Sequence, residues 1–279
     1  MAVRDAAKSV NPGIVVFEEN WSADSTGSTT YGNDPAAYHN DADIATGHEV
    51  GTIGYRADLG ETGMKYATLD EWISYITMLK FTRAMDGSKP SWILTYGYQE
   101  GDAERLAAII LANRGNYYET KGPSMADSVG TAYRTKMFSW ISGNEDTLYE
   151  VRSAADIAVY YSTRSRDLLD QNNGDPYDTS DTVFFAEYRS VANLLTRNHF
   201  IYDVVADISD TMDYDLVVLP NVRCMSESEA AQIEEFLWVG GKVIATGETG
   251  SSDEWCEPRS ANVFDDAAVV RVEDLDDLY

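Results

Sequence analysis

The sequence predicts an α/β protein in which a partial (β/α) TIM-type barrel is followed by a flavodoxin-like, doubly wound parallel sheet. Two observations support this prediction. Short, continuously apolar segments, typical of strands buried on both faces, alternate along the chain with segments of helical periodicity. Near the C-terminus, two such strands are joined by one short helix, and that connection implies a right-handed crossover in a parallel sheet.

This strand–helix–strand unit occupies residues 214–250. Residues 216–219 form the first apolar strand, and Ser226 is placed to cap the helix that follows. Apolar residues recur at helical spacing up to Gly240 and Gly241, which are expected to end the helix. Residues 242–246 form the second strand. This unit determines the fold class predicted for the second region, residues 153–279.

The rest of that region continues the alternation. We expect a strand at 157–162, a polar loop at 163–180, a helix at 182–197, a strand around 204–205 and a short strand at 268–270. Strands and helices in this order favour the doubly wound sheet.

The first region, residues 1–152, also alternates. Strands are predicted at 14–17, 43–47, 92–96 and 116–119, with helices at 69–85, 103–112 and 129–141. Polar or carboxylate residues follow each strand, and in a (β/α) barrel those strand ends form the rim of the active site. A closed barrel needs eight strands. We therefore expect the C-terminal half of a barrel, with a smaller open sheet as the alternative.

The charge of the chain limits the classes of partner that it can bind. Of 279 residues, 47 are acidic and 21 basic, which gives a formal net charge of −26. This argues against nucleic acid or an anionic membrane as a partner. The acids are spread along the chain and only seven of the basic residues are lysines. We interpret this surface as an adaptation to a salt-filled cytoplasm, as in halophilic archaea. An ordinary acidic protein is the alternative.

Three further features bear on the compartment. No apolar run approaches the ~18 residues that a membrane-spanning helix needs, and the N-terminus lacks the apolar core of a signal peptide. Two cysteines, Cys224 and Cys256, do not suggest a disulfide framework, so we expect two free thiols in a reducing compartment. Together these features predict a cytoplasmic protein.

At residues 155–257 the sequence resembles a known family. The pattern LVVLPNV, GGKVIATGETG and DEW is similar to the trimerisation domain of glycoside hydrolase family 42 β-galactosidases, and to glycosyl hydrolases that carry this domain behind a barrel. The resemblance implies a carbohydrate-active enzyme that forms a homo-oligomer such as a trimer. It implies no cofactor, and no metal-ligand spacing is visible in the sequence.

Glycoside hydrolysis usually needs two carboxylates that flank one bond. The carboxylates predicted at strand ends supply the candidates: Glu19, Glu49 and Glu18 for catalysis. Partial burial there would raise a carboxyl pKa towards the range needed for a general acid. Substrate contacts are predicted for the aromatic, histidine and acidic residues at the same strand ends, namely His48, Trp21, Tyr96 and Glu119.

Two alternatives remain open at this stage. A half barrel would lack any catalytic residue that the missing half carries. The first alternative is therefore that the chain is a non-catalytic oligomerisation or carbohydrate-binding fragment. The second region also looks related to class I glutamine amidotransferases, whose nucleophilic cysteine lies in a tight turn after a strand. Here Glu248 occupies that turn, Cys224 begins a different helix, and His199 is interpreted as structural.

Overall fold

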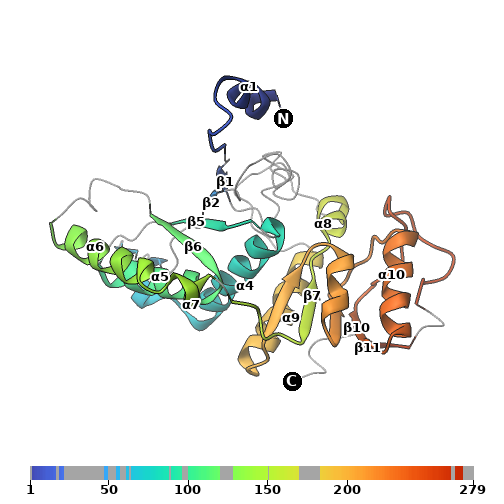
Figure 1. The fold of residues 1–279 in the computed structure, drawn as a ribbon. Coiled ribbons are helices and arrows are strands. Elements are labelled where there is room, and N and C mark those ends of the chain that lie inside the picture. The colour runs from blue at the N-terminus through green and yellow to red at the C-terminus, as the bar shows by residue number, and fades with distance from the viewer. Residues whose placement is uncertain are drawn as a thin grey trace. The chain divides into compact units, whose positions relative to one another are not determined.

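The structure is a computed structural model (Figure 1). It describes residues 2–16, 19–21, 47–49, 55–56, 61–62, 64–87, 89–95, 100–119, 128–149, 151–169, 183–264 and 268–272. The described residues divide into two compact units, with the division between Arg152 and Ser153. Each unit is built around its own parallel sheet, so the predicted α/β class with parallel sheets is confirmed.

The first unit contains a four-stranded sheet in which every neighbouring pair of strands is parallel. The spatial order, β1-β2-β5-β6, follows the order along the chain. A two-stranded antiparallel sheet, β3-β4, accompanies it. The strands are β1 (Glu19–Trp21), β2 (Gly47–Glu49), β3 (Tyr55–Arg56), β4 (Glu61–Thr62), β5 (Ser91–Thr95) and β6 (Gly115–Glu119).

Helix α4 shows how the sequence fixes local structure in this unit. Thr68 caps it: the Thr68 hydroxyl accepts a hydrogen bond from the amide of Glu71, whose carboxylate accepts one in return from the Thr68 amide. Gly87, with φ of 55°, follows its last turn. The helices are α1 (Ala2–Val10), η1 (Met64–Tyr66), α4 (Leu69–Asp86), α5 (Glu100–Ala112), α6 (Ser128–Ser142) and α7 (Glu145–Leu148).

An apolar cluster joins α4, α5 and α6 to one face of the sheet. Tyr75 and Leu79 of α4, Ile93 of β5, Ile110 of α5 and Met137 of α6 are all buried in it. Burial of this many large apolar side chains is the main stabilising contribution in the first unit.

The second unit contains a five-stranded, entirely parallel sheet. Its spatial order is β11-β10-β9-β7-β8, so the chain runs outwards to β8, returns past β7 and continues to the other edge. The strands are β7 (Ile157–Tyr160), β8 (Tyr202–Val205), β9 (Leu216–Leu219), β10 (Lys242–Thr246) and β11 (Val269–Val272). The helices are α8 (Thr163–Leu169), α9 (Val183–Arg197), η3 (Ile208–Asp213) and α10 (Glu227–Trp238).

The strand–helix–strand unit predicted at 214–250 is confirmed as β9, α10 and β10. Ser226 caps α10 as expected, and the carboxylate of Glu229 completes a capping box with it. Gly241 must be a glycine because a Cβ there would lie 2.4 Å from the ring of Phe236, which is buried.

Two local predictions need correction, and a third lies mostly outside the described residues. Residues 163–180 were expected to be a loop, but 163–169 form helix α8. The strand predicted at 14–17 is wrong for residues 14–16, which lie outside any strand, and the first strand begins instead at Glu19. Residues 43–46 of the next predicted strand lie outside the described residues, and β2 begins at Gly47.

Candidate functional site

The backbone of the first sheet brings some of the predicted site residues together. Trp21 and Glu49 are direct register partners on the neighbouring strands β1 and β2. The same row continues to Leu94 on β5 and to Tyr118 on β6. This row therefore crosses all four strands near their carboxyl ends, where parallel α/β folds assemble ligand sites.

Glu19 lies two residues before Trp21 and in register with Gly47. A strand rises about 3.3 Å per residue and neighbouring strands lie about 4.8 Å apart, so the Cα atoms of Glu19 and Glu49 are about 8 Å apart. Because Glu19 opens β1, it does not follow a strand as the sequence suggested. The other predicted catalytic residue, Glu18, and the predicted sugar contact Tyr96 lie outside the described residues.

His48 and Glu119 occupy different rows. His48 is in register with Asn20 and Ile93, and that row continues to Tyr117. Glu119 ends β6 opposite Thr95, two strands from β2. The sheet therefore brings Glu19, Trp21 and Glu49 close together, whereas Glu119 lies farther along the rim.

Sequence reasoning missed an aromatic pair close to these carboxylate positions. Trp92 of β5 is in the row of Glu19, and Tyr118 of β6 is in the row of Glu49. Both side chains are half-buried, and their ring centroids lie 5.9 Å apart. The alternation within SWILT and GNYYE was the available signal, because successive residues of a strand face opposite sides of the sheet.

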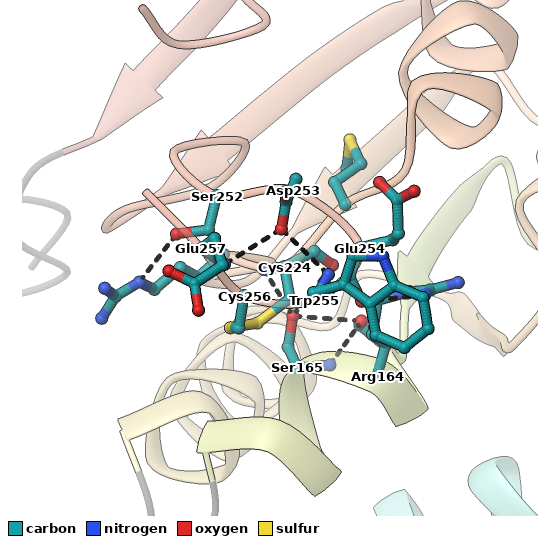
Figure 2. The surroundings of a disulfide bond; sticks show 12 residues. Arg164, Ser165, Cys224, Ser252, Asp253, Glu254, Trp255, Cys256 and Glu257 are labelled. Atoms are coloured by element: carbon teal, nitrogen blue, oxygen red, sulfur yellow. Dashed lines mark hydrogen bonds between the residues drawn. A yellow bond between two sulfur atoms is a disulfide. The ribbon is translucent and has the colours of Figure 1, made fainter. Parts of the chain in front are cut away.

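The carboxyl edge of the second sheet contains a disulfide rather than a reactive thiol (Figure 2). Cys224, fully buried after β9, is bonded to Cys256, and their Cα atoms lie 4.7 Å apart. The prediction of two free thiols is wrong, because the loop after β10 folds back over the end of β9. An isolated bridge joins Cys224 to Ser252 of that loop. With both cysteines of the chain in this bond, neither is available as the nucleophile of an amidotransferase-like reaction.

The loop that carries Cys256 is braced by further hydrogen bonds (Figure 2). The carboxylate of Asp253 accepts hydrogen bonds from the amides of Trp255 at 2.9 Å and Glu257 at 3.0 Å. The guanidinium of Arg164 donates to the carbonyl oxygen of Glu254 at 3.1 Å. These contacts fix the loop's backbone, while the indole of Trp255 remains exposed.

The polar side chains beneath this loop form a paired network. The phenol of Tyr160 donates to one carboxylate oxygen of Glu229 at 2.9 Å, and the guanidinium of Arg164 lies 3.6 Å from the other oxygen. Burial, and secondly the charge of Glu229, raise the pKa of Tyr160 well above its ordinary value. Tyr160 is therefore a neutral hydrogen-bond donor at physiological pH, and this cluster holds α10 against β7.

Glu248, where an amidotransferase would carry its thiol, lies in a turn bounded by Gly247 and Gly250, both at positive φ. Its amide donates to the side chain of Asn221 at 2.9 Å, and its exposed carboxylate pairs with Arg223 at 3.2 Å. His199, interpreted from the sequence as structural, adopts φ of 61° in the turn between α9 and β8. The turn of Glu248, at the carboxyl edge of the sheet, is therefore stabilised by these contacts.

Two features are absent from the described residues. No group of three or more histidine, cysteine, aspartate or glutamate residues there is arranged to hold a metal ion. Of the helices in the same part of the chain, none has the length and apolarity needed to cross a membrane. A cavity of about 630 Å³ lies between α5 and α6, lined mainly by apolar residues, away from the strands that carry the predicted carboxylates.

Comparison with known proteins identifies the class. Residues 155–261 match the family model described as the β-galactosidase trimerisation domain. The chain therefore carries this domain and is related to the glycoside hydrolase family 42 β-galactosidases, which confirms the resemblance found in residues 155–257. A β-galactosidase of Bifidobacterium bifidum is 42% identical over 60 residues, which is 22% of this chain and 9% of that protein.

Solved structures share the fold over most of the chain. A polyextremophilic β-galactosidase from the Antarctic haloarchaeon Halorubrum lacusprofundi is 18% identical, with a TM-score of 0.68 over 95% of this chain and 42% of that chain. A β-galactosidase from Bacillus circulans sp. alkalophilus is 15% identical, with a TM-score of 0.67 over 92% and 39%. An exo-carrageenase of family 42 from Bacteroides ovatus is 12% identical, with a TM-score of 0.65 over 99% and 41%. The chain thus spans about two fifths of the length of these proteins.

Proposed function

We propose that this chain is part of a glycoside hydrolase that cleaves a glycosidic bond with paired carboxylates, Glu19 and Glu49. The observation that carries the proposal is the register of β1 and β2, which makes Trp21 and Glu49 direct partners with Glu19 two residues earlier. Strand alternation assigns these three positions to the same face of the sheet. Their Cα separation of about 8 Å lets two glutamate side chains approach to the ~5–9.5 Å used by retaining and inverting enzymes.

The other candidates divide between the two faces of the sheet. The row of His48 contains Ile93 and Tyr117, which are buried in the helix-covered core, so alternation assigns His48 to that face. The face of Glu49 contains Trp92 and Tyr118 instead. Aromatic rings beside a carboxylate pair would give a sugar ring an apolar surface to stack on. We therefore propose Trp21, Trp92 and Tyr118 as sugar contacts ahead of His48 and Glu119.

Chemically, one of the two carboxyl groups would protonate the oxygen of the leaving group. The other would act on the anomeric carbon directly or through a water molecule, depending on its distance from the first. A water molecule supplies the hydroxyl group that ends on the anomeric carbon, and the protein contributes only side chains, without a cofactor. Relatives described as β-galactosidases favour a β-galactoside as the substrate.

The proposed architecture is the C-terminal half of a (β/α) barrel, residues 1–152, followed by a flavodoxin-like domain, residues 153–279. Four parallel strands in chain order support the half barrel, since a complete barrel has eight. In the second unit, counting strands along the chain gives the spatial order 2-1-3-4-5, which is the flavodoxin-like order. The active centre would be completed by a further half barrel, supplied by another chain or by a longer form of this one.

We further propose that the protein self-associates through the second unit, whose family model describes a trimerisation domain. The whole chain's charge of −26 and its likeness to a haloarchaeal enzyme favour a salt-adapted protein. The cytoplasmic location expected from the sequence loses one of its supports, because the Cys224–Cys256 disulfide replaces the two expected free thiols and such bonds are rare in reducing compartments. The alternative function, a non-catalytic oligomerisation or carbohydrate-binding fragment, is favoured by the same four-stranded sheet that leaves the barrel half complete.

The test is hydrolysis of an aryl β-galactoside in 0.1 M and ~3 M KCl by the wild type, Glu19→Gln, Glu49→Gln and the control Glu104→Gln. Loss of an essential acid or base is expected to reduce kcat/KM about 10²–10⁴-fold, while the control, an exposed helix carboxylate, retains activity. Full activity in Glu49→Gln would refute the proposed pair. A wild type that binds galactose by calorimetry without hydrolysing the glycoside would instead support the carbohydrate-binding alternative.

A further inference from the structure

Among the exposed large apolar side chains of the second unit, five lie in three segments that precede strands of the sheet. Phe200 and Ile201 are 57% and 62% exposed, Met212 is 45% exposed, and Trp238 and Val239 are 86% and 56% exposed. Scattered single apolar residues are ordinary on a protein surface, whereas a group of them marks an interaction site.

The topology places all five at the amino edge of the sheet. Phe200 and Ile201 lead directly into β8, Met212 lies in η3 just before β9, and Trp238 and Val239 precede β10. The register aligns the first residues of the strands, because Tyr202 pairs with Ile157, Ile157 with Leu216 and Leu216 with Lys242.

The spacing of the strands sets the size of this surface. From β8 to β10 is three strand spacings, about 14 Å, which large side chains can bridge. Helix α10, which ends at Trp238, also packs against η3, the helix of Met212. The five residues therefore lie along one edge of the sheet, from the β8 end to the β10 end, and are called here the amino-edge patch.

Charged groups border the amino-edge patch. Asp156, Asp215 and Lys242 are exposed along the same edge, where the amide of Asp215 donates to the carbonyl of Asp156 and the amide of Lys242 to that of Asp215. Lys242 is the only lysine in residues 153–279. Opposite charges beside one apolar surface are suited to a partner with the same arrangement, since the lysine of one molecule can meet an aspartate of the next.

We propose that the amino-edge patch is the surface through which copies of this chain associate. The inference rests on the self-association proposed above and assigns it to particular residues. A ring such as a trimer uses two different surfaces on each molecule. The patch supplies them: Phe200 and Ile201 at the β8 end, and Trp238 and Val239 at the β10 end. An apolar contact also survives the molar salt that screens charge pairs, which suits an acidic chain.

The experiment measures the molar mass of the full chain by light scattering after size exclusion, from micromolar loading in ~3 M KCl. The variants are Trp238→Glu and Ile201→Glu, one at each end of the amino-edge patch. The control is Trp255→Glu, which replaces a comparably exposed tryptophan (75%) in the loop at the carboxyl edge of the sheet. Thermal unfolding of each variant verifies that the fold is retained.

We expect the wild type and Trp255→Glu to exceed the monomer mass of 30.9 kDa, and each patch variant to weaken association at least 100-fold and elute as a monomer. A monomeric wild type would overturn self-association itself. An oligomeric wild type with unchanged mass in both patch variants would overturn only the assignment to this surface. Dissociation by Trp255→Glu with both patch variants unaffected would move the interface to the carboxyl edge.

Discussion

Removal of the disulfide is expected to lower the stability of the second unit by an amount that follows from the length of the loop that the bond closes. Cys224 and Cys256 are 32 residues apart in the sequence. In the chain-entropy model, closing a loop of that length lowers the entropy of the unfolded chain by about 12 cal/mol/K, or about 3.7 kcal/mol at 25 °C. Cys256→Ser is the preferred change. Cys256 is half-buried, so the new hydroxyl can reach water, whereas Cys224 is fully buried and serine there would add a desolvation cost.

The assay is denaturant unfolding in ~3 M KCl, followed by tryptophan fluorescence, with and without a reducing agent. We expect Cys256→Ser to lower the free energy of unfolding of the second unit by about 3–4 kcal/mol. Reducing agent should lower the free energy of unfolding of the wild type by a similar amount and leave that of Cys256→Ser unchanged. The variant therefore serves as the control for any other effect of the reducing agent.

Two results would contradict this reasoning. A change below about 1 kcal/mol would mean that the loop of residues 251–258 is held by its hydrogen bonds and not by the cross-link. A wild type that reacts with two equivalents of a thiol reagent after unfolding without reductant would show that the bond is not formed, in agreement with the expectation from sequence.

Two further predictions concern packing and pH. Gly241→Ala places a Cβ 2.4 Å from the ring of Phe236, so we expect a loss of about 1–3 kcal/mol in chemical unfolding; Gly143→Ala, with no neighbour closer than 3.5 Å, is the control and should stay within about 0.5 kcal/mol. Burial, and then the charges of Asp207 and Asp213, raise the pKa of Asp210. A carboxyl with a raised folded-state pKa favours folding most below its ordinary pKa, and this stability is lost as the pH rises through the raised value. The Asp210→Asn variant should therefore lose less stability than the wild type as the pH rises above about 4. The difference should be less than about 0.5 kcal/mol, because solvent screens the carboxyl group. Identical pH profiles of stability for the two proteins at low salt would contradict this prediction.

The local elements could be predicted from sequence because their causes are local. The apolar run Leu216–Leu219, the cap at Ser226 and the glycines at 240 and 241 lie within one short segment, and each acts on its immediate neighbours. The same holds for α4, predicted at 69–85 and observed at Leu69–Asp86 with its Thr68 cap. The family resemblance also came from contiguous residues, and the family model matches the same segment.

The candidate site could be predicted only in part from the sequence. That glutamates stand near strand ends could be read from the sequence, but which of them share a row could not, because register depends on how two strands distant in sequence align. Glu19 and Glu49 are thirty residues apart, and only the pairing of β1 with β2 makes them neighbours. The aromatic pair Trp92 and Tyr118 was missed for the same reason.

By itself, then, the sequence determined the class of the fold, most helix ends, the acidic surface and the family relationship, since composition and short-range periodicity carry that information. Only the tertiary structure decided the disulfide, the register at the carboxyl ends of the first sheet and the apolar amino edge of the second. Each of these depends on segments that meet across tens of residues. Such contacts form because burying apolar surface in two separate cores outweighs the entropy of closing the intervening chain, and no local pattern records that balance.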